Sequence, residues 1–184
     1  MTGGGQNSEF EPTIVGPVLR GERVVLRPAR NEDRARLRSI LGEPDVAEWW
    51  TPGGPDHAVD EWLEPTEDGA TFVVELDGVV IGSIQYAEES ETVYRHAGID
   101  IFLDTEHHGV GLGSDAVRTL AGYLLEVRGH HRLTIDPAAA NERAIRAYRR
   151  VGFRPVGVMR SYERGADGTW HDGLLLDLLA GELT

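Results

Sequence analysis

Apolar and polar residues alternate along much of the chain, and other stretches repeat their apolar residues every three or four positions. Alternation is typical of β-strands, and the longer repeat is typical of amphipathic helices. Strands are expected at residues 24–27, 70–76, 79–86, 93–103, 132–136, 153–160 and 170–179. Helices are expected at residues 31–41, 56–63 and 114–127, and from Asn141 onward. This order predicts an α+β protein with a mixed, mostly antiparallel central sheet flanked by helices.

The length of 184 residues favours a single domain. Residues 1–16 begin with a glycine-rich polar stretch and are expected to form a disordered tail, which leaves residues 17–184 as the folded domain. The N-terminus lacks the pattern of a signal peptide, and no apolar run approaches the roughly 18 residues of a membrane span. We therefore expect a cytoplasmic protein without a membrane partner.

Cysteine is absent, which excludes disulfides, thiolate metal sites and a cysteine nucleophile. The net charge is −13, and between Glu43 and Glu106 the only arginine is Arg95. Such a charge repels nucleic acid and attracts cations. A solvated acidic surface without a specific partner explains many of these residues equally well.

A glycine-rich loop follows the fourth expected strand. The strand ends in Asp100-Ile101-Phe102-Leu103, and His108-Gly109-Val110-Gly111-Leu112-Gly113-Ser114 then opens a helix. Free backbone amides at such a helix start bind anions, most often phosphate. A nucleoside-triphosphate loop would need a lysine, which this chain lacks, and a dinucleotide fingerprint would need a different glycine spacing. A tight turn with no ligand remains the alternative.

A second motif further along the chain resolves this choice. The next helix carries Asn141, Ala144, Tyr148, Gly152 and Phe153 in the pattern Asn-x-x-Ala-x-x-x-Tyr-x-x-x-Gly-Phe. The loop and this helix together resemble the GCN5-related N-acetyltransferase (GNAT) superfamily, whose loop reads Gln/Arg-x-x-Gly-x-Gly/Ala. His108 stands where the superfamily has Gln or Arg. The resemblance covers nearly the whole chain and implies the acetyltransferase fold, with acetyl-CoA as co-substrate and no metal.

The resemblance also implies roles for individual residues. The loop from His108 to Ser114 would hold the diphosphate of acetyl-CoA. Backbone groups of Ile101, Phe102 and Leu103 would pair with the pantetheine arm and polarise the thioester carbonyl. Asn141 would contact the pantetheine or simply cap its helix, beside Ala144. Tyr148 would protonate the departing thiolate; a phenol can donate to a thiolate of pKa about 8.5. A packing role for Tyr148 is the alternative.

Asp100 is the candidate proton acceptor. An amine with a pKa near ~10.4 arrives protonated, and a carboxylate in the middle of the central strand can bind the ammonium and take its proton, directly or through water. Aspartate is disfavoured within strands, so its presence there points to a function. An edge or surface aspartate without a function is the alternative.

Three local features bear on the acceptor. Glu48-Trp49-Trp50, Gly98-Ile99-Asp100 and Asp136-Pro137 resemble the aminoglycoside 6'-N-acetyltransferases, which implies a drug-resistance enzyme with direct transfer in a ternary complex. Its substrate pocket would use Trp49 or Trp50, Asp100 and Asp136. The stretch Gly168-Thr169-Trp170-His171-Asp172-Gly173 also resembles acetyltransferases of ribosomal-protein N-termini. That rival activity, another small amine and a non-catalytic acetyl-CoA-binding module stay open, as does the choice between monomer and homodimer.

Overall fold

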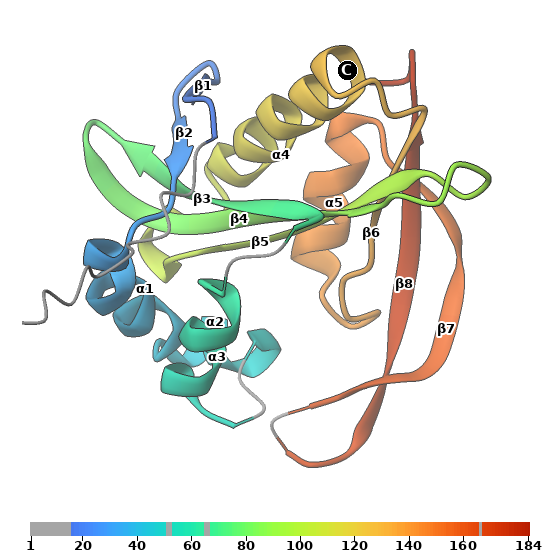
Figure 1. Ribbon diagram of the computed structural model, residues 1–184. Helices are drawn as coiled ribbons and strands as arrows, with labels where there is room; N and C mark the ends of the chain where they lie inside the picture. The colour runs from blue at the N-terminus through green and yellow to red at the C-terminus, as the bar shows by residue number, and fades with distance from the viewer. Residues whose placement is uncertain (1–15, 51–52, 65–66, 166) are drawn as a thin grey trace, which may run out of the picture.

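The computed structural model describes residues 16–184 except 51–52, 65–66 and 166. The expected tail therefore lies almost wholly outside the described residues. The described chain forms one sheet with helices on both faces (Figure 1). The α+β class and the mixed, mostly antiparallel sheet predicted from the sequence are confirmed.

The sheet has eight strands in the order β1-β2-β3-β4-β5-β6-β8-β7. Every neighbouring pair is antiparallel except β5 and β6, which run parallel. The strands are β1 (Leu19–Arg20), β2 (Val25–Pro28), β3 (Gly69–Leu76), β4 (Val79–Glu89), β5 (His96–Leu103), β6 (Arg132–Ile135), β7 (Arg154–Arg164) and β8 (Trp170–Leu179). The parallel pairing of β5 with β6 joins strands β1–β5 to the C-terminal strands β6, β8 and β7.

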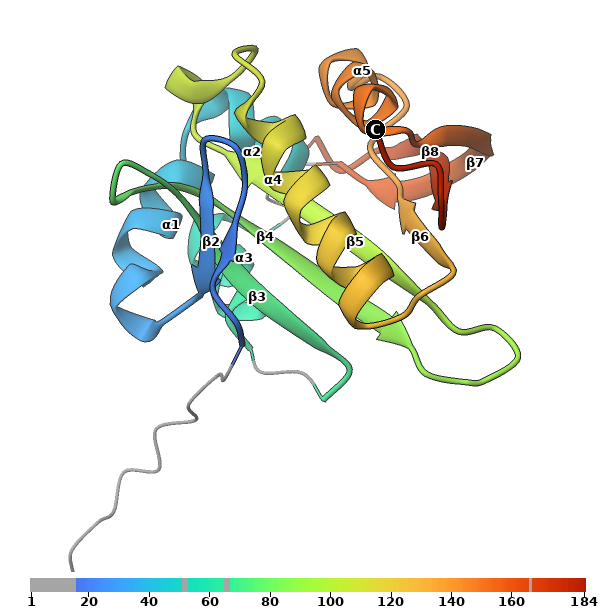
Figure 2. The same ribbon diagram turned by 90° about the horizontal axis from the view of Figure 1, so that it is seen from above.

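Helices cover both faces of this sheet (Figures 1 and 2). They are α1 (Arg34–Leu41), α2 (Pro44–Trp50), α3 (Pro55–Trp62), α4 (Leu112–Gly122) and α5 (Glu142–Val151), with short 3-10 turns η1 (Asn31–Asp33) and η2 (Thr105–His107) and a π-helical end η3 (Tyr123–Val127). One core packs α4 and α5 against the sheet, and a second packs α1, α2 and α3 against its other face. Because side chains alternate along β5, Ile101 joins the first core and Phe102 the second.

Most expected elements are present within a few residues, but three differ. Residues 44–50 were not assigned as a helix, yet they form α2 with Pro44 at its first position, where proline is well tolerated. The strand expected from residue 93 begins at His96, because the amide of Tyr94 closes a turn onto the carbonyl of Glu91. Strand β7 continues to Arg164 through two irregularities.

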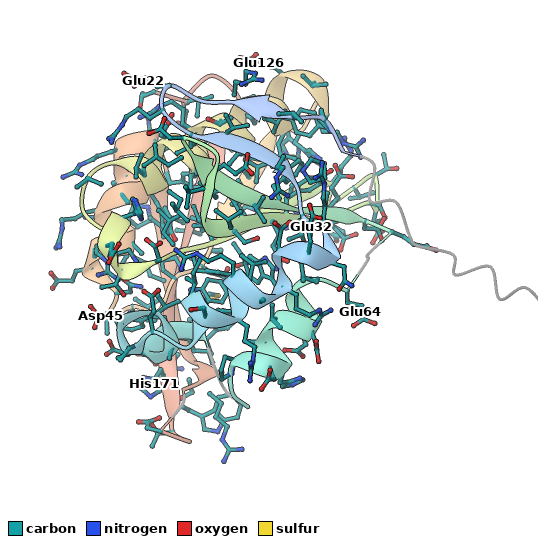
Figure 3. All side chains as sticks on the ribbon, turned by 90° about the vertical axis from the view of Figure 1, so that its left-hand side faces the viewer. Glu22, Glu32, Asp45, Glu64, Glu126 and His171 are labelled. Carbon is teal, nitrogen blue, oxygen red and sulfur yellow. The ribbon has the colours of Figure 1, made fainter. Side chains whose placement is uncertain are left out.

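The acidic excess is distributed over the surface. Figure 3 labels Glu32, Asp45, Glu64 and Glu126, which lie on well-separated parts of the molecule. Several other acids are paired internally; Asp33 and Glu75 both hold Arg27 at 2.7 Å. No described helix is long and apolar enough to cross a membrane.

Candidate active site

The glycine loop lies between β5 and α4, as the sequence predicts. Gly109 and Gly111 have φ values of 76° and 91°, which a residue with a side chain rarely adopts. A Cβ added at either glycine would meet nothing within 4 Å, so the loop borders open space. The first amides of α4 have no carbonyl a turn earlier to bind, and they remain available for an anion. This loop fits the diphosphate of acetyl-CoA.

Two carboxylates hold the ends of this loop. Asp104 is 2% exposed and binds Arg36 and the ring of His107, each at 2.5 Å. Asp115, in the first turn of α4, accepts hydrogen bonds from three successive amides of the β1–β2 turn. From that turn, the guanidinium of Arg23 donates to the carbonyl of Val110 at 2.9 Å. The carboxylate of Asp115 is thus bound by amides of the β1–β2 turn.

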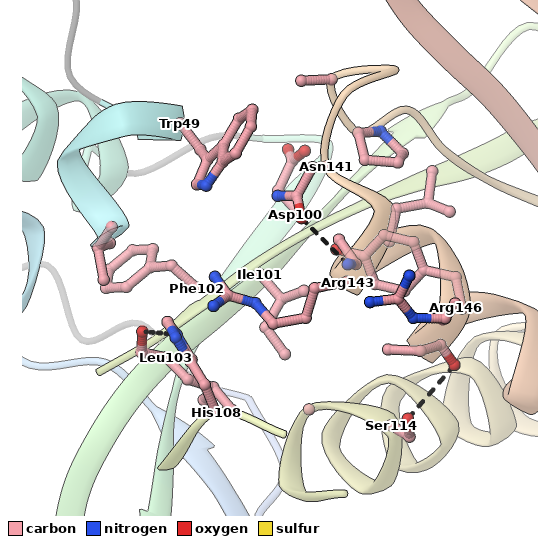
Figure 4. Close-up of a pocket in the computed structure, with 18 of the residues that line it drawn as sticks. Trp49, Asp100, Ile101, Phe102, Leu103, His108, Ser114, Asn141, Arg143 and Arg146 are labelled. Carbon is pink, nitrogen blue, oxygen red and sulfur yellow. Dashed lines mark hydrogen bonds between the residues drawn. The ribbon is translucent and has the colours of Figure 1, made fainter. Parts of the chain in front are cut away.

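His108 follows the turn η2 and lies close to the end of β5. Its Nε2 donates to the carbonyl of Leu103 at 2.9 Å (Figure 4), so Nδ1 carries the lone pair. That Nδ1 is buried and has no hydrogen-bond partner among the described residues. Burial is the main factor that lowers the pKa of His108, and the ring is therefore neutral near pH 7. A neutral histidine adds no positive charge to the loop where the superfamily pattern has Gln or Arg.

The two parallel strands separate next to this loop. Pairing of β5 with β6 stops at Gly98, while β5 stays paired with β4 up to Leu103. The amide of Asp104 donates to Ile81 on β4. Because backbone groups along a strand point alternately to its two neighbours, those of Ile101 point to the open side. The backbone of Phe102 points to β4, and its contribution to the cavity is its ring.

A cavity of about 480 Å³ occupies the gap between the strands. It collects most of the residues singled out in the sequence (Figure 4). They are Trp49, Trp50, Asp100, Ile101, Phe102, Leu103, His108, Gly109, Gly111, Gly113, Ser114, Asp136, Asn141, Ala144 and Tyr148. Val110 and Leu112 do not line it: Val110 is 54% exposed and Leu112 is fully buried in the core.

Asp100 lies on β5 in the partly buried wall of this cavity. Its carboxylate accepts a hydrogen bond from Gln85, its cross-strand neighbour on β4, at 3.2 Å. Burial is the largest cause that raises the pKa of Asp100 to about 6; the Gln85 bond opposes the shift and the charge of Asp136 adds to it. A carboxylate with this pKa is ionised at pH 7 yet accepts a proton more readily than an ordinary aspartate.

Tyr148 is held on α5. Asn141 caps this helix by accepting a hydrogen bond from the amide of Ala144 at 3.1 Å, and Gly152 ends it with φ 116°. Tyr148 is 8% exposed and lines the cavity. Burial, followed by the charge of Asp100, raises its pKa well above the ordinary value of 10. The phenol is therefore protonated at any working pH and has a proton to donate.

The tryptophan segment forms another wall. Trp50 packs edge-on against Trp62 with ring centroids 5.1 Å apart, and its ring lies 5.9 Å from that of Phe102. Trp49 lies on the same helix, α2, and points toward the cavity (Figure 4). Both rings are partly buried. Trp50 therefore serves the second core as well as the cavity wall.

Sequence reasoning missed several residues of the cavity. Arg143, Arg146 and Arg150 are exposed on α5 and line its rim. Tyr162 and Glu163 enter it from β7. The arginines could have been found from helical spacing, since residues three or four apart share one side of a helix. Nothing local marks Tyr162, because it reaches the cavity through an irregularity of its strand.

Comparison with known proteins agrees with this geometry. A domain model described as "Acetyltransferase (GNAT) domain" matches residues 23–154. The spermidine N(1)-acetyltransferase of Escherichia coli K12 is 29% identical over 139 residues, covering 73% of this chain and 74% of its own length. The aminoglycoside N(6')-acetyltransferase type 1 of Klebsiella pneumoniae is 30% identical over 159 residues, with 75% and 77% covered.

A solved structure of AAC(6')-Ib in complex with paromomycin and acetyl-CoA is also similar. It superposes with a TM-score of 0.70 at 28% identity and covers 86% of this chain and 94% of that one. Among the described residues, no group of three or more potential ligands is placed to hold a metal ion. The chain belongs to the acetyltransferase (GNAT) family and is an acetyl-CoA-dependent N-acetyltransferase.

Proposed function

We propose that the enzyme acetylates an amine of a polycationic small molecule, with an aminoglycoside antibiotic as the first candidate and its 6'-amine as the expected position. One observation carries this proposal. The carboxylates of Asp100 and Asp136 line the same cavity as the glycine loop and Tyr148. A cleft that offers carboxylates next to an aromatic wall suits a substrate with several ammonium groups.

The proton of the attacking amine goes to Asp100. An ammonium of pKa near ~10 must lose a proton before it can attack, and the carboxylate of Asp100, with its pKa raised to about 6, lines the cavity in the middle of β5. Gln85 donates to one carboxylate oxygen at 3.2 Å, and no hydrogen bond from the described residues reaches the other. In this proposal the proton passes to Asp100 directly or through a water.

Acetyl-CoA supplies an activated acetyl group. In this proposal the chain binds acetyl-CoA through backbone amides and positively charged side chains. The amides at the start of α4 take the diphosphate. Arg143, Arg146 and Arg150 line the rim, and guanidinium groups bind phosphate oxygens well. The open backbone of Ile101 faces the gap between β5 and β6, where an extended arm can pair with it. Tyr148 donates its proton to the departing thiolate.

The names of the relatives support a polycationic acceptor but do not single out one substrate. The aminoglycoside relative supports an antibiotic substrate. The spermidine relative, almost equally similar, supports a polyamine as the second candidate. Both acceptors are polycations, in agreement with the acids of the cavity. Acetylation of an aminoglycoside in the cytoplasm would remove one positive charge, weaken the attraction of the drug to RNA, and so confer resistance.

A CoA-release assay tests this proposal. The enzyme is offered kanamycin, spermidine and a basic N-terminal peptide with saturating acetyl-CoA, and the products are mapped by mass spectrometry. We expect turnover of kanamycin, with acetylation at the 6'-amine, and weaker turnover of spermidine. Turnover of the peptide alone would contradict the proposal and assign the cleft to a protein N-terminus. No turnover with any amine would refute it altogether.

A further inference from the structure

Strand β7 is irregular where it borders the cavity through Tyr162 and Glu163. Its pairing with β8 shifts between Met159 and Glu163, and Ser161 has a φ of 49°. A residue with a side chain seldom adopts this left-handed conformation, and such conformations concentrate at functional sites. Irregularities of this kind also re-aim side chains. The residue that follows Ser161 is Tyr162, which lines the cavity together with Asp136.

Two contacts with β8 maintain this conformation. The amide of Ser161 donates to the carboxylate of Asp172 at 2.8 Å. A Cβ added to Gly173 would lie 2.8 Å from Cδ1 of Tyr162, closer than side chains approach one another. The ring of Tyr162, a residue that is 48% exposed, therefore packs directly on the backbone of Gly173, and a side chain at that position would have to displace it.

The same part of β8 also holds the connection that follows Asp136. The amide of Ala139 donates to the carbonyl of Asp172 at 2.8 Å, and the amide of Leu174 donates to Pro137 at 2.9 Å. One short segment, residues 172–174, thus fixes two pieces of chain relative to each other. One piece carries Tyr162 and the other carries Asp136.

We propose that Tyr162 is a positioning residue for the acceptor, and that it orients the carboxylate of Asp136 toward a cationic group of the substrate. A carboxylate accepts about four hydrogen bonds, so the hydroxyl of Tyr162 can occupy one position while an ammonium occupies another. A carboxylate fixed before binding loses less freedom when the substrate arrives. The inference rests on the proposed function, since it needs a cationic acceptor.

The ionisation of Tyr162 agrees with this role. Hydrogen bonding to Asp136 is the first cause that raises the pKa of Tyr162 to about 12, and burial is the second. The hydroxyl is therefore protonated at any pH at which the enzyme works, and it remains a donor. Glu163, the next residue, also lines the cavity. Burial is the main factor that raises its pKa, which the charge of Asp136 raises further.

The first test is Tyr162→Phe, which keeps the ring and removes the donor. We expect the KM for kanamycin and for spermidine to rise about fivefold to tenfold, the effect of one net hydrogen bond. The kcat should stay within about twofold, and the KM for acetyl-CoA should not change. An unchanged acceptor KM would overturn the inference. A lowered KM would also overturn it, because the hydroxyl would then compete with the substrate.

The second test removes the room for the ring without altering the cavity wall itself. Gly173→Ala should displace Tyr162 and raise the acceptor KM, whereas in a Tyr162→Ala background the same change should add little, since the clash is gone. Gly157→Ala is the matched control on the same strand pair, because a Cβ there meets nothing within 4 Å. Equal effects of Gly173→Ala in both backgrounds would contradict the proposed contact.

A readout that needs no acceptor separates this inference from the proposed function. In ¹³C-tyrosine NMR spectra, the Tyr162 resonance is assigned from its loss in Tyr162→Phe. Asp136→Asn and Gly173→Ala should each shift it, and Gly157→Ala should not. If neither shifts it, the inference is wrong even in an active enzyme. If both shift it but no amine is acetylated, the proposed function is wrong and Tyr162 still lies on Asp136.

Discussion

Replacement of Asp100 by asparagine should stabilise the protein while it lowers activity. The carboxylate of Asp100 is partly buried, and its pKa is raised from 3.8 to about 6. A carboxyl group with a raised pKa in the folded state favours the protonated form there, so its ionisation destabilises the fold. This cost is absent below about pH 4, grows between pH 4 and 6, and is complete above pH 6.

The size of the effect follows from the shift. A change of about 2 pKa units, from 3.8 to about 6, corresponds to about 3 kcal/mol at 1.36 kcal/mol per unit. Because the carboxylate borders an open cavity, solvent lowers this value, and we expect about 2 kcal/mol at pH 8. Asparagine has nearly the same shape and can still accept the hydrogen bond from Gln85. For a chain of this size, about 2 kcal/mol raises the Tm by roughly 4–8 °C.

The assay is thermal unfolding of the wild type and Asp100→Asn at pH 8 and pH 4. The two proteins should differ at pH 8 and converge at pH 4. Glu106→Gln is the matched control, since it removes the same charge from an exposed position and measures the general effect of lower net charge. A Tm for Asp100→Asn that is unchanged or lower at pH 8, or a gain of equal size at both pH values, would refute the reasoning.

Two further variants probe the cofactor side. Tyr148→Phe should lower kcat by roughly 10²–10⁴ while calorimetry shows an almost unchanged acetyl-CoA affinity, because the ring stays and only the proton donor is lost; a normal kcat at every pH would mean that Tyr148 only packs. Gly111→Asp should weaken acetyl-CoA binding more than tenfold, which is at least about 1.4 kcal/mol, since it puts a side chain and a negative charge at the loop. Gly129→Asp, at a similar φ of 70° away from the cavity, should leave that affinity intact, and equal losses in both variants would argue against the loop assignment.

Local patterns predicted the framework of the site. The glycine loop and the helix from Asn141 to Gly152 each lie within a continuous stretch, and their signals, closely spaced glycines and a capped helical motif, can be read from adjacent residues. Strand alternation likewise predicted the mostly antiparallel sheet. Helix α2 was missed altogether, and the extent of some other elements was wrong, because tertiary contacts decide where a strand begins and ends.

Contacts between distant segments could not be predicted in this way. Gln85 meets Asp100 because β4 and β5 pair in one particular register. Arg36 binds Asp104 from helix α1, 68 positions earlier in the chain. Helix α1 packs on the face of the sheet opposite to α4, which the loop precedes. Tyr162 enters the cavity only because Ser161 turns the strand and Gly173 leaves room. Sequence spacing carries no information on such pairings, since each depends on how separate elements pack.

The pH dependence of kcat/KM for kanamycin between pH 5 and 9 would test most directly whether Asp100 takes the proton in this cavity. If it does, log kcat/KM should bend near pH 6, with a slope greater by about one unit per pH unit on the acidic side. The bend should be absent in Asp100→Asn, which should also have a lower kcat and a higher kanamycin KM. A wild-type profile without a bend near pH 6, or the same bend in Asp100→Asn, would contradict this role for Asp100.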